Sequence, residues 1–325
     1  MALRNNGRKT VHKRLEYIDK AKGVLISLMV IGHIWQSGLV FDTIYAFHMP
    51  AFFAISGILM AYTESYRKPL SQFIKSRIFA YGVPFVFIEL LGCLTDIVRN
   101  GITLNWKGYL YNTLTFDFND PNLWFLVNLF LIEVLMAVLL KLRLGKKRLC
   151  IIAVLLFAVR YVLPTEVIYV STVTSVFKYF SCFAGGFAGR DLLKKGNKVI
   201  LGASLGAVLA YAVFGGIITL RGAKDIAYLV SGMAGTYVVL QLALRKWPDW
   251  LEKFFAAAGK NTLIIYGTHH IYYATLGVLL SVKSFAHTSI AIGMVILAVV
   301  VLLEIPTIYV INRWAPFLAG KRRRK

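Results

Sequence analysis

Long apolar runs alternate with short polar segments along the whole chain. Apolar runs of about 17 to 25 residues predict transmembrane helices, because a helix needs about 20 residues to cross the hydrocarbon core. The pattern therefore predicts an all-α, polytopic integral membrane protein with about ten spans. These lie near residues 23–41, 43–63, 78–98, 122–140, 149–164, 171–189, 199–219, 225–244, 262–282 and 288–311.

The distribution of charge orients these spans. The net charge is +22, although only 16% of the residues are charged, fewer than a soluble domain carries. Basic residues concentrate in every second polar segment, at 4–14, 67–77, 141–148, 190–198, 245–260 and 321–325. The positive-inside rule then places both termini in the cytoplasm. Since no soluble domain remains to carry a nucleic-acid site, we expect no nucleic-acid partner.

The chain is expected to form one membrane domain. We assign residues 1–22 to a cytoplasmic basic segment, 23–312 to the membrane domain and 313–325 to a cytoplasmic basic tail. The first helix is predicted to be retained, because no short apolar core with a cleavage site precedes it. The three cysteines have neither a disulfide framework nor zinc spacing, so no metal is expected. Aromatic residues in the loop 99–121 fit either an interfacial belt or a surface that stacks on a sugar.

Lys22 and His33 are the first candidates for chemistry. Ten residues separate them, so they share a helix face about three turns apart. His33 lies about 15 Å into its span, near the midplane, where an ionisable residue is costly. A neutral imidazole there suits a general base, and the alternative is a structural hydrogen bond between helices. Lys22 either binds an anionic ligand at the cytoplasmic rim or only fixes the topology.

The neighbouring spans offer supporting residues. Arg77, at the expected start of the third span, suits phosphate because its guanidinium donates in a fork. Asp19 either orients Lys22 or belongs to a charged helix start. His48 and Pro50 fall in the outer part of the second span, where the proline permits a kink. Ser56, with Gly57, fits close packing or a ligand contact.

The ninth predicted span carries Asn261, Tyr266 and His269 from its cytoplasmic end. His269 approaches His33 if the first and ninth helices are neighbours. Most other ionisable groups near the spans are expected to pair acid with base. They are Glu89, Asp96, Glu133, Arg160, Lys178 and Glu304. The glycine pairs Gly185/Gly189 and Gly202/Gly206 predict close helix packing.

Four segments together resemble a known family. They are YIDKAKGVLISLMVIGH at 17–33, FHMPAFFAISG at 47–57, NLWFLVNLF at 122–130 and GKNTLIIYGTHH at 259–270. In this order they resemble the acyltransferase family 3 membrane proteins, in particular the fucose 4-O-acetylase and related acetyltransferase branch. The first two motifs are the specific ones.

The resemblance implies a ten-helix enzyme in the cell membrane that takes an acyl group, usually acetyl, from cytosolic acyl-coenzyme A. Its acceptor would be a hydroxyl of an envelope glycan or related molecule. The family's basic residue falls on Lys22, where many members have arginine, and its histidine on His33. Further family positions fall on His48, Arg77 and His269. The C-terminal esterase-like domain of some relatives does not follow in this sequence.

The expected function is therefore membrane-bound O-acetyl transfer, with acetyl-CoA as substrate and no permanently bound cofactor. His33 would be the general base, and Lys22 with Arg77 would hold the donor. Ser56, Tyr266 or Asn261 would stabilise the oxyanion. Two alternatives stay open: a transporter of a lipid-linked sugar or small anion, and a structural subunit. The acceptor is open among polysaccharide, peptidoglycan, lipid-linked sugar and a small metabolite.

Overall fold

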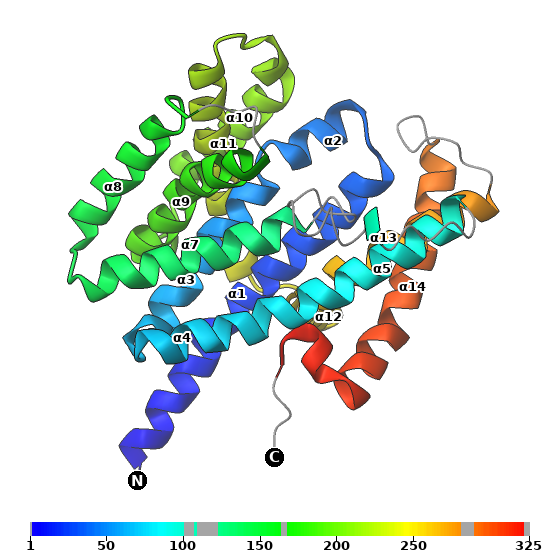
Figure 1. The fold of residues 1–325 in the computed structure, drawn as a ribbon, viewed down its shortest axis with the longest axis horizontal. Coiled ribbons are helices and arrows are strands. Elements are labelled where there is room, and N and C mark those ends of the chain that lie inside the picture. The colour runs from blue at the N-terminus through cyan, green and yellow to red at the C-terminus, as the bar shows by residue number, and fades with distance from the viewer. Residues whose placement is uncertain (1, 101–106, 109–122, 164–167, 281–288, 322–325) are drawn as a thin grey trace. The chain divides into compact units, whose positions relative to one another are not determined.

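The structure is a computed structural model that describes residues 2–100, 107–108, 123–163, 168–280 and 289–321. Its regular elements there are all helices (Figure 1), in agreement with the predicted all-α class. The loop 99–121 falls mostly outside these residues. In chain order the elements are α1 (Ala2–Ile34), α2 (Gly38–Tyr45), α3 (His48–Thr63), η1 (Ser65–Arg67), α4 (Leu70–Arg77), η2 (Ile78–Gly82), α5 (Val83–Asn100), α7 (Trp124–Lys141), α8 (Lys146–Val159), α9 (Ile168–Leu193), α10 (Lys198–Phe214), η3 (Gly215–Ile217), α11 (Arg221–Leu244), α12 (Asp249–Lys260), α13 (Thr262–Leu279), α14 (Ile290–Trp314) and η5 (Pro316–Ala319).

Among the residues that the structure describes, six helical stretches are long and apolar enough to cross a membrane. They are Gly38–Thr63, Leu70–Ile97, Trp124–Lys141, Lys198–Ile217, Arg221–Leu244 and Ile290–Trp314. The total of ten spans and the cytoplasmic position of both termini stay predictions. The predicted fifth span is the helix α8, whose 14 residues fall short of the usual spanning length.

The boundaries of the first three predicted spans are corrected. The first does not run to residue 41, because α1 ends at Ile34 and Gly38 follows with φ +84°, a conformation that favours glycine. In the second, Pro50 stands in the first turn of α3 and not at a kink in the middle of the helix. A proline is tolerated there because the backbone N–H groups of the first turn have no partner within the helix. The third begins at Leu70, with a π-helical turn at η2, so Arg77 lies inside it.

The chain divides into two compact units. The first contains Met1–Gly32, Ser37–Glu64 and Cys182–Thr262, and the second contains His33–Gln36, Ser65–Ser181 and Leu263–Lys325. Within the first unit, α11 packs against α3 and α10, and α10 also contacts α2. Within the second, α7 packs against α4 and η2, while α5 and α14 both contact η5. A small apolar cluster of Ile264, Ile311 and Ala319 joins the last helices.

Glycines allow close helix contacts within the first unit, as the sequence indicated for Gly57. A methyl group at Gly57 would stand 2.1 Å from the carbonyl oxygen of Phe183, and one at Gly186 would stand 2.0 Å from that of Ala54. These two contacts bring α3 and α9 together. The prediction for Gly202 and Gly206 was wrong, because a methyl group at either would meet no described atom within 4 Å.

Candidate active site

Two of the predicted site residues, His33 and His269, meet within the second unit. His33 stands in the last turn of α1, where its carbonyl oxygen accepts a hydrogen bond from Gln36 Nε2 at 3.0 Å. His269 lies on α13 and is fully buried. The two ring centroids are 5.2 Å apart in a T-shaped arrangement. The structure therefore joins two imidazoles that are far apart in sequence.

The contacts of His269 fix its tautomer. Its Nδ1 lies 2.8 Å from the carbonyl oxygen of Ile265, one turn earlier on α13. Because a carbonyl oxygen only accepts, Nδ1 carries the hydrogen, and in the neutral ring Nε2 is left as an acceptor. Nε2 is buried and has no hydrogen-bond partner among the described residues. A buried acceptor left in this way costs about 1–3 kcal/mol, so it marks a position for a ligand or for a neighbour's proton.

Tyr273 completes this cluster and was missed by the sequence analysis. Its ring centroid lies 6.2 Å from that of His33, 6.0 Å from that of His269 and 4.7 Å from that of His270. The side chain is buried. Its position four residues after His269, and therefore on the same helix face, was the available signal. The cluster thus combines three imidazoles with one phenol.

Polar contacts hold α13 against α14. Thr268 Oγ1 lies 2.8 Å from Glu304 Oε1 and 3.0 Å from Oε2, and both residues are buried. One turn further on, the hydroxyls of Tyr272 and Thr307 are hydrogen bonded. The expected acid–base pairing thus takes another form at Glu304, whose carboxylate accepts a hydrogen bond from the Thr268 hydroxyl. Thr268 and Tyr272 thus connect α13 to α14 on either side of His269 in the sequence.

Lys22 and Asp19 belong to the first unit and lie next to each other on α1. Lys22 Nζ is 3.4 Å from Asp19 Oδ1, the contact expected if Asp19 orients the lysine. Both side chains keep about a quarter of their surface exposed, 25% and 23%. Lys22 is therefore a partly exposed cation, accessible to an anion.

The preceding lysine makes a stronger connection. Lys20 Nζ donates to Glu252 Oε1 on α12 at 2.9 Å and to the carbonyl oxygen of Arg245 at 3.3 Å. The backbone N–H of Trp247 donates to the same Glu252 oxygen. The hydrogen bond from Lys20 lowers the pKa of Glu252 below its ordinary value. This pair joins the beginning of α12 to the segment of α1 that carries Asp19 and Lys22.

Arg77 is placed deeper in its helix than expected, and its charge is compensated. Its Nε lies 2.7 Å from Glu133 Oε2, and its Nη2 donates to Ser65 Oγ at 3.0 Å. Tyr81, four residues later, donates to the other Glu133 oxygen at 3.0 Å. This acid–base pair was anticipated for Glu133. A donor-binding role for Arg77 stays a prediction, since the guanidinium already has an acidic partner.

Removal of Glu133 tests the structural role of this pair. Glu133→Ala leaves the Arg77 guanidinium without its carboxylate, and breaking a buried pair on one side costs about 3 kcal/mol. We expect a clearly lower thermal unfolding midpoint in detergent. The double variant Arg77→Met/Glu133→Leu removes both charges and should recover most of the loss. A Glu133→Ala protein as stable as wild type would contradict the structural role.

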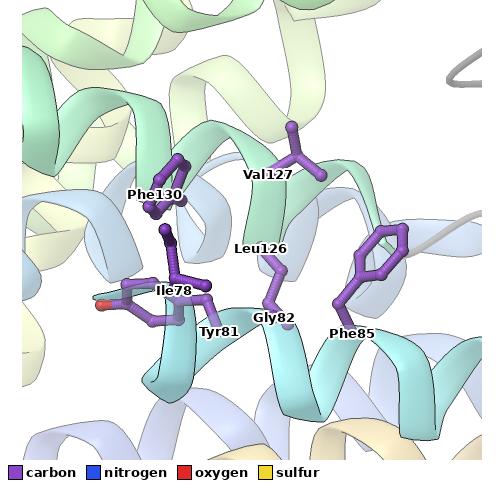
Figure 2. Close-up of a pocket in the computed structure, with 7 residues that line it drawn as sticks. All are labelled: Ile78, Tyr81, Gly82, Phe85, Leu126, Val127 and Phe130. Atoms are coloured by element: carbon purple, nitrogen blue, oxygen red, sulfur yellow. The ribbon is translucent and has the colours of Figure 1, made fainter. Parts of the chain in front are cut away.

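Figure 2 shows an apolar cavity of about 230 Å³ in the second unit, with Tyr81 in its lining. Ile78, Tyr81, Gly82 and Phe85 line it from η2 and α5, and Leu126, Val127 and Phe130 line it from α7. The Tyr81 hydroxyl is committed to Glu133. The lining contains none of the predicted catalytic residues, so the cavity is separate from the histidine cluster.

The remaining predicted residues have local partners. His48, in the first unit, is buried, with Nδ1 2.9 Å from the Ile44 carbonyl oxygen and its ring against Tyr45. The Ser56 hydroxyl donates to the Phe52 carbonyl oxygen at 2.8 Å, and the Asn261 amide donates to that of Ala257. Tyr266 is buried with its ring 5.9 Å from that of Phe125. Their supporting roles stay predictions.

Within the described residues, no group of three or more His, Cys, Asp or Glu side chains is arranged to hold a metal ion. The imidazole and phenol groups of the histidine cluster can transfer protons and form hydrogen bonds. These groups suit the activation of a hydroxyl.

Comparison with known proteins supplies the class. The family profile described as "Acyltransferase domain" matches residues 15–307. This match covers most of the chain, so the protein belongs to the acyltransferase 3 family and is a multi-pass membrane acyltransferase. The match includes all of the predicted site residues.

A curated relative is more distant. The chain is 38% identical over 81 residues to the nodulation protein NolL of Mesorhizobium japonicum, a match covering 21% of this chain and 21% of the relative. The similarity thus spans about a fifth of that protein. No solved structure matches the chain.

Proposed function

We propose that this membrane acyltransferase is an O-acetyltransferase of the cell membrane. It moves an acetyl group from cytosolic acetyl-CoA to a hydroxyl of an envelope glycan or related acceptor. The observation that carries this proposal is the contact of His33 with His269, whose buried Nε2 is an acceptor without a partner among the described residues. A general base next to a second imidazole suits the removal of a proton from an alcohol.

The proposed reaction conserves protons. His33 takes the proton of the acceptor hydroxyl while the oxygen attacks the thioester carbonyl carbon. The tetrahedral intermediate then loses the coenzyme A sulfur, which receives the proton from His33 as the acetyl ester forms. His269 Nε2 is oriented as an acceptor by the bond of Nδ1 to Ile265, so it suits an N–H of the His33 imidazolium. In this role His269 is a positioning residue.

The oxyanion needs a separate donor. The hydroxyl of Ser56 already donates to its own helix, and Ser56 lies in the other compact unit. Tyr273 has its ring beside both histidines, and its phenol is a hydrogen-bond donor. We therefore add Tyr273 to the candidate Tyr266 for oxyanion stabilisation. Asn261 donates to the Ala257 carbonyl oxygen and belongs to the first unit, like Ser56, so the same two observations apply to it.

Lys22 is proposed to bind the phosphates of the donor. Lys22→Ala removes a partly exposed cation and should raise the KM for acetyl-CoA, with a smaller effect on kcat. Lys22→Arg keeps the charge and adds a fork of donors, so it should retain donor binding. The measurement is the initial rate of acetyl transfer over a range of acetyl-CoA concentrations. Unchanged donor kinetics in Lys22→Ala would refute this role.

Labelled acetyl-CoA distinguishes the enzyme from its rivals. Membranes containing the protein are incubated with the label, with and without a glycan acceptor fraction. We expect ester-linked label that depends on both the protein and the acceptor. Movement of a sugar or anion without label transfer would instead indicate a transporter. If neither process depends on His33 or Lys22, the protein would be a structural subunit. Mass spectrometry of envelope glycans from a deletion strain then identifies the acceptor.

A further inference from the structure

Residues 249–260 form the short amphipathic helix α12. From the charge pattern alone, this segment was interpreted as a cytoplasmic connection between two spans. Helix α12 has 12 residues, about 18 Å, which is too short to cross a bilayer. It follows α11, a stretch long and apolar enough to span, and only residues 245–248 separate the two helices. Its position in the chain is therefore that of a helix at a membrane surface.

One face of α12 packs closely on α1. A methyl group at Gly23 would stand 1.9 Å from the carbonyl oxygen of Phe255, and one at Gly259 would stand 1.7 Å from that of Asp19. The ion pair between Lys20 and Glu252 lies at the other end of the same contact. The inner face of α12 thus packs on α1, next to the turn that carries Lys22.

The opposite face exposes large apolar side chains. Trp250 is 70% exposed and Phe254 is 40% exposed, and Ala257 is exposed beside them. These positions follow the spacing i, i+4, i+7, so they form one stripe. Two exposed lysines, Lys253 and Lys260, are neighbours on one flank of this stripe.

We propose that α12 docks onto the anionic lipid surface of the cytoplasmic leaflet. Trp250 and Phe254 enter the boundary between headgroups and acyl chains, and Lys253 and Lys260 contact lipid phosphates. An exposed apolar stripe flanked by lysines is the composition of an interfacial helix, and tryptophan favours this depth. Free phosphate would leave the apolar stripe without a partner, which is why the lipid surface fits better. The docking does not depend on the proposed reaction.

Docking has a consequence for the donor end of α1. Since α12 is fixed to Asp19 and Gly23, a lipid surface that holds α12 also holds the turn between them, which includes Lys22. The lipid composition of the cytoplasmic leaflet thereby acts on the residue proposed to bind the donor.

The test places a fluorescent label on the stripe of the full-length protein. Cys93, Cys150 and Cys182 are replaced by alanine, and Ala257→Cys is labelled. The matched control is Asp249→Cys, which is exposed at the outer edge of the lysine flank, about 100° around the helix from the centre of the stripe. Each protein is reconstituted in nanodiscs of phosphatidylcholine with or without phosphatidylglycerol. Quenching is measured with nitroxide on the lipid chains and with aqueous iodide.

In anionic discs we expect the lipid-chain nitroxide to quench the label at residue 257 at least twofold more than the label at residue 249. Aqueous iodide should quench the label at 249 more than the label at 257. Lys253→Gln/Lys260→Gln should halve the lipid quenching, as should high salt, provided that its thermal unfolding midpoint matches that of wild type. Three results would overturn the proposal: iodide quenching at 257 equal to that at 249, protection of 257 from both quenchers by a protein partner, or equal lipid quenching in the two kinds of disc.

Discussion

Replacement of His33 by alanine is expected to lower acetyl transfer by at least about 10²-fold, and up to about 10⁴-fold, because general base catalysis contributes this much. The imidazole stands against His269 and Tyr273, and it is the group proposed to take the proton of the acceptor hydroxyl. The protein should still insert and fold, since His33 lies in the last turn of its helix. The measurement is the rate of label transfer at saturating acetyl-CoA.

Two further variants separate chemistry from structure at this position. His33→Gln keeps a polar side chain but takes no proton, so it should lose as much activity as His33→Ala. His269→Gln should retain some activity with an altered pH profile, as expected of a positioning residue. Normal acetylation by a well-folded His33→Ala protein would remove His33 from the mechanism.

Gly259→Ala is expected to destabilise the protein strongly, by about 3 kcal/mol, the upper end of the cost of overpacking. The added methyl group would stand 1.7 Å from the carbonyl oxygen of Asp19. A backbone oxygen cannot rotate away like a side chain, so α12 must move from α1. The usual gain of about 1 kcal/mol for alanine over glycine in a helix is too small to offset this. The thermal unfolding midpoint in detergent should fall by many degrees.

Gly202→Ala is the matched control for this substitution. Gly202 also lies inside a helix, but it is exposed, and a methyl group there would meet no described atom within 4 Å. The thermal unfolding midpoint of the Gly202→Ala protein should be unchanged or slightly raised, because the substitution only replaces glycine by a residue with a higher helix propensity. Equal midpoints for the Gly259→Ala and Gly202→Ala proteins would contradict the close contact of α1 with α12.

The sequence predicted the helical class and several helix boundaries well because hydropathy reports helix composition directly. It placed the end of α1 too late, since the apolar pattern continues through residue 41 while Ser37 and Gly38 interrupt the helix. It treated the segment of α12 as a connection, because four basic residues within 245–260 hide its apolar stripe. The close packing expected at Gly57 is confirmed, whereas the glycine spacing at Gly202 and Gly206 was misleading, since spacing does not say which helix face meets a neighbour.

The sequence indicated which residue types belong to the candidate histidine cluster, but it did not indicate which of these residues lie next to one another. A histidine inside an apolar run pointed to His33 and to His269, whereas their contact within the second unit joins residues more than 200 positions apart and cannot be read from the sequence. Tyr273 was missed because a tyrosine in a membrane span has many ordinary roles. The pairing of Arg77 with Glu133 required the earlier start of its helix at α4, which the polar sequence of that turn concealed.

The most direct test of the central claim uses the purified protein in proteoliposomes with labelled acetyl-CoA and an envelope glycan fraction. We predict that coenzyme A thiol is released in a one-to-one ratio with ester-linked label on the acceptor, and that the His33→Ala protein forms neither product. Release of thiol without ester, or uptake of a sugar or anion with no thiol released, would contradict the assignment as an O-acetyltransferase.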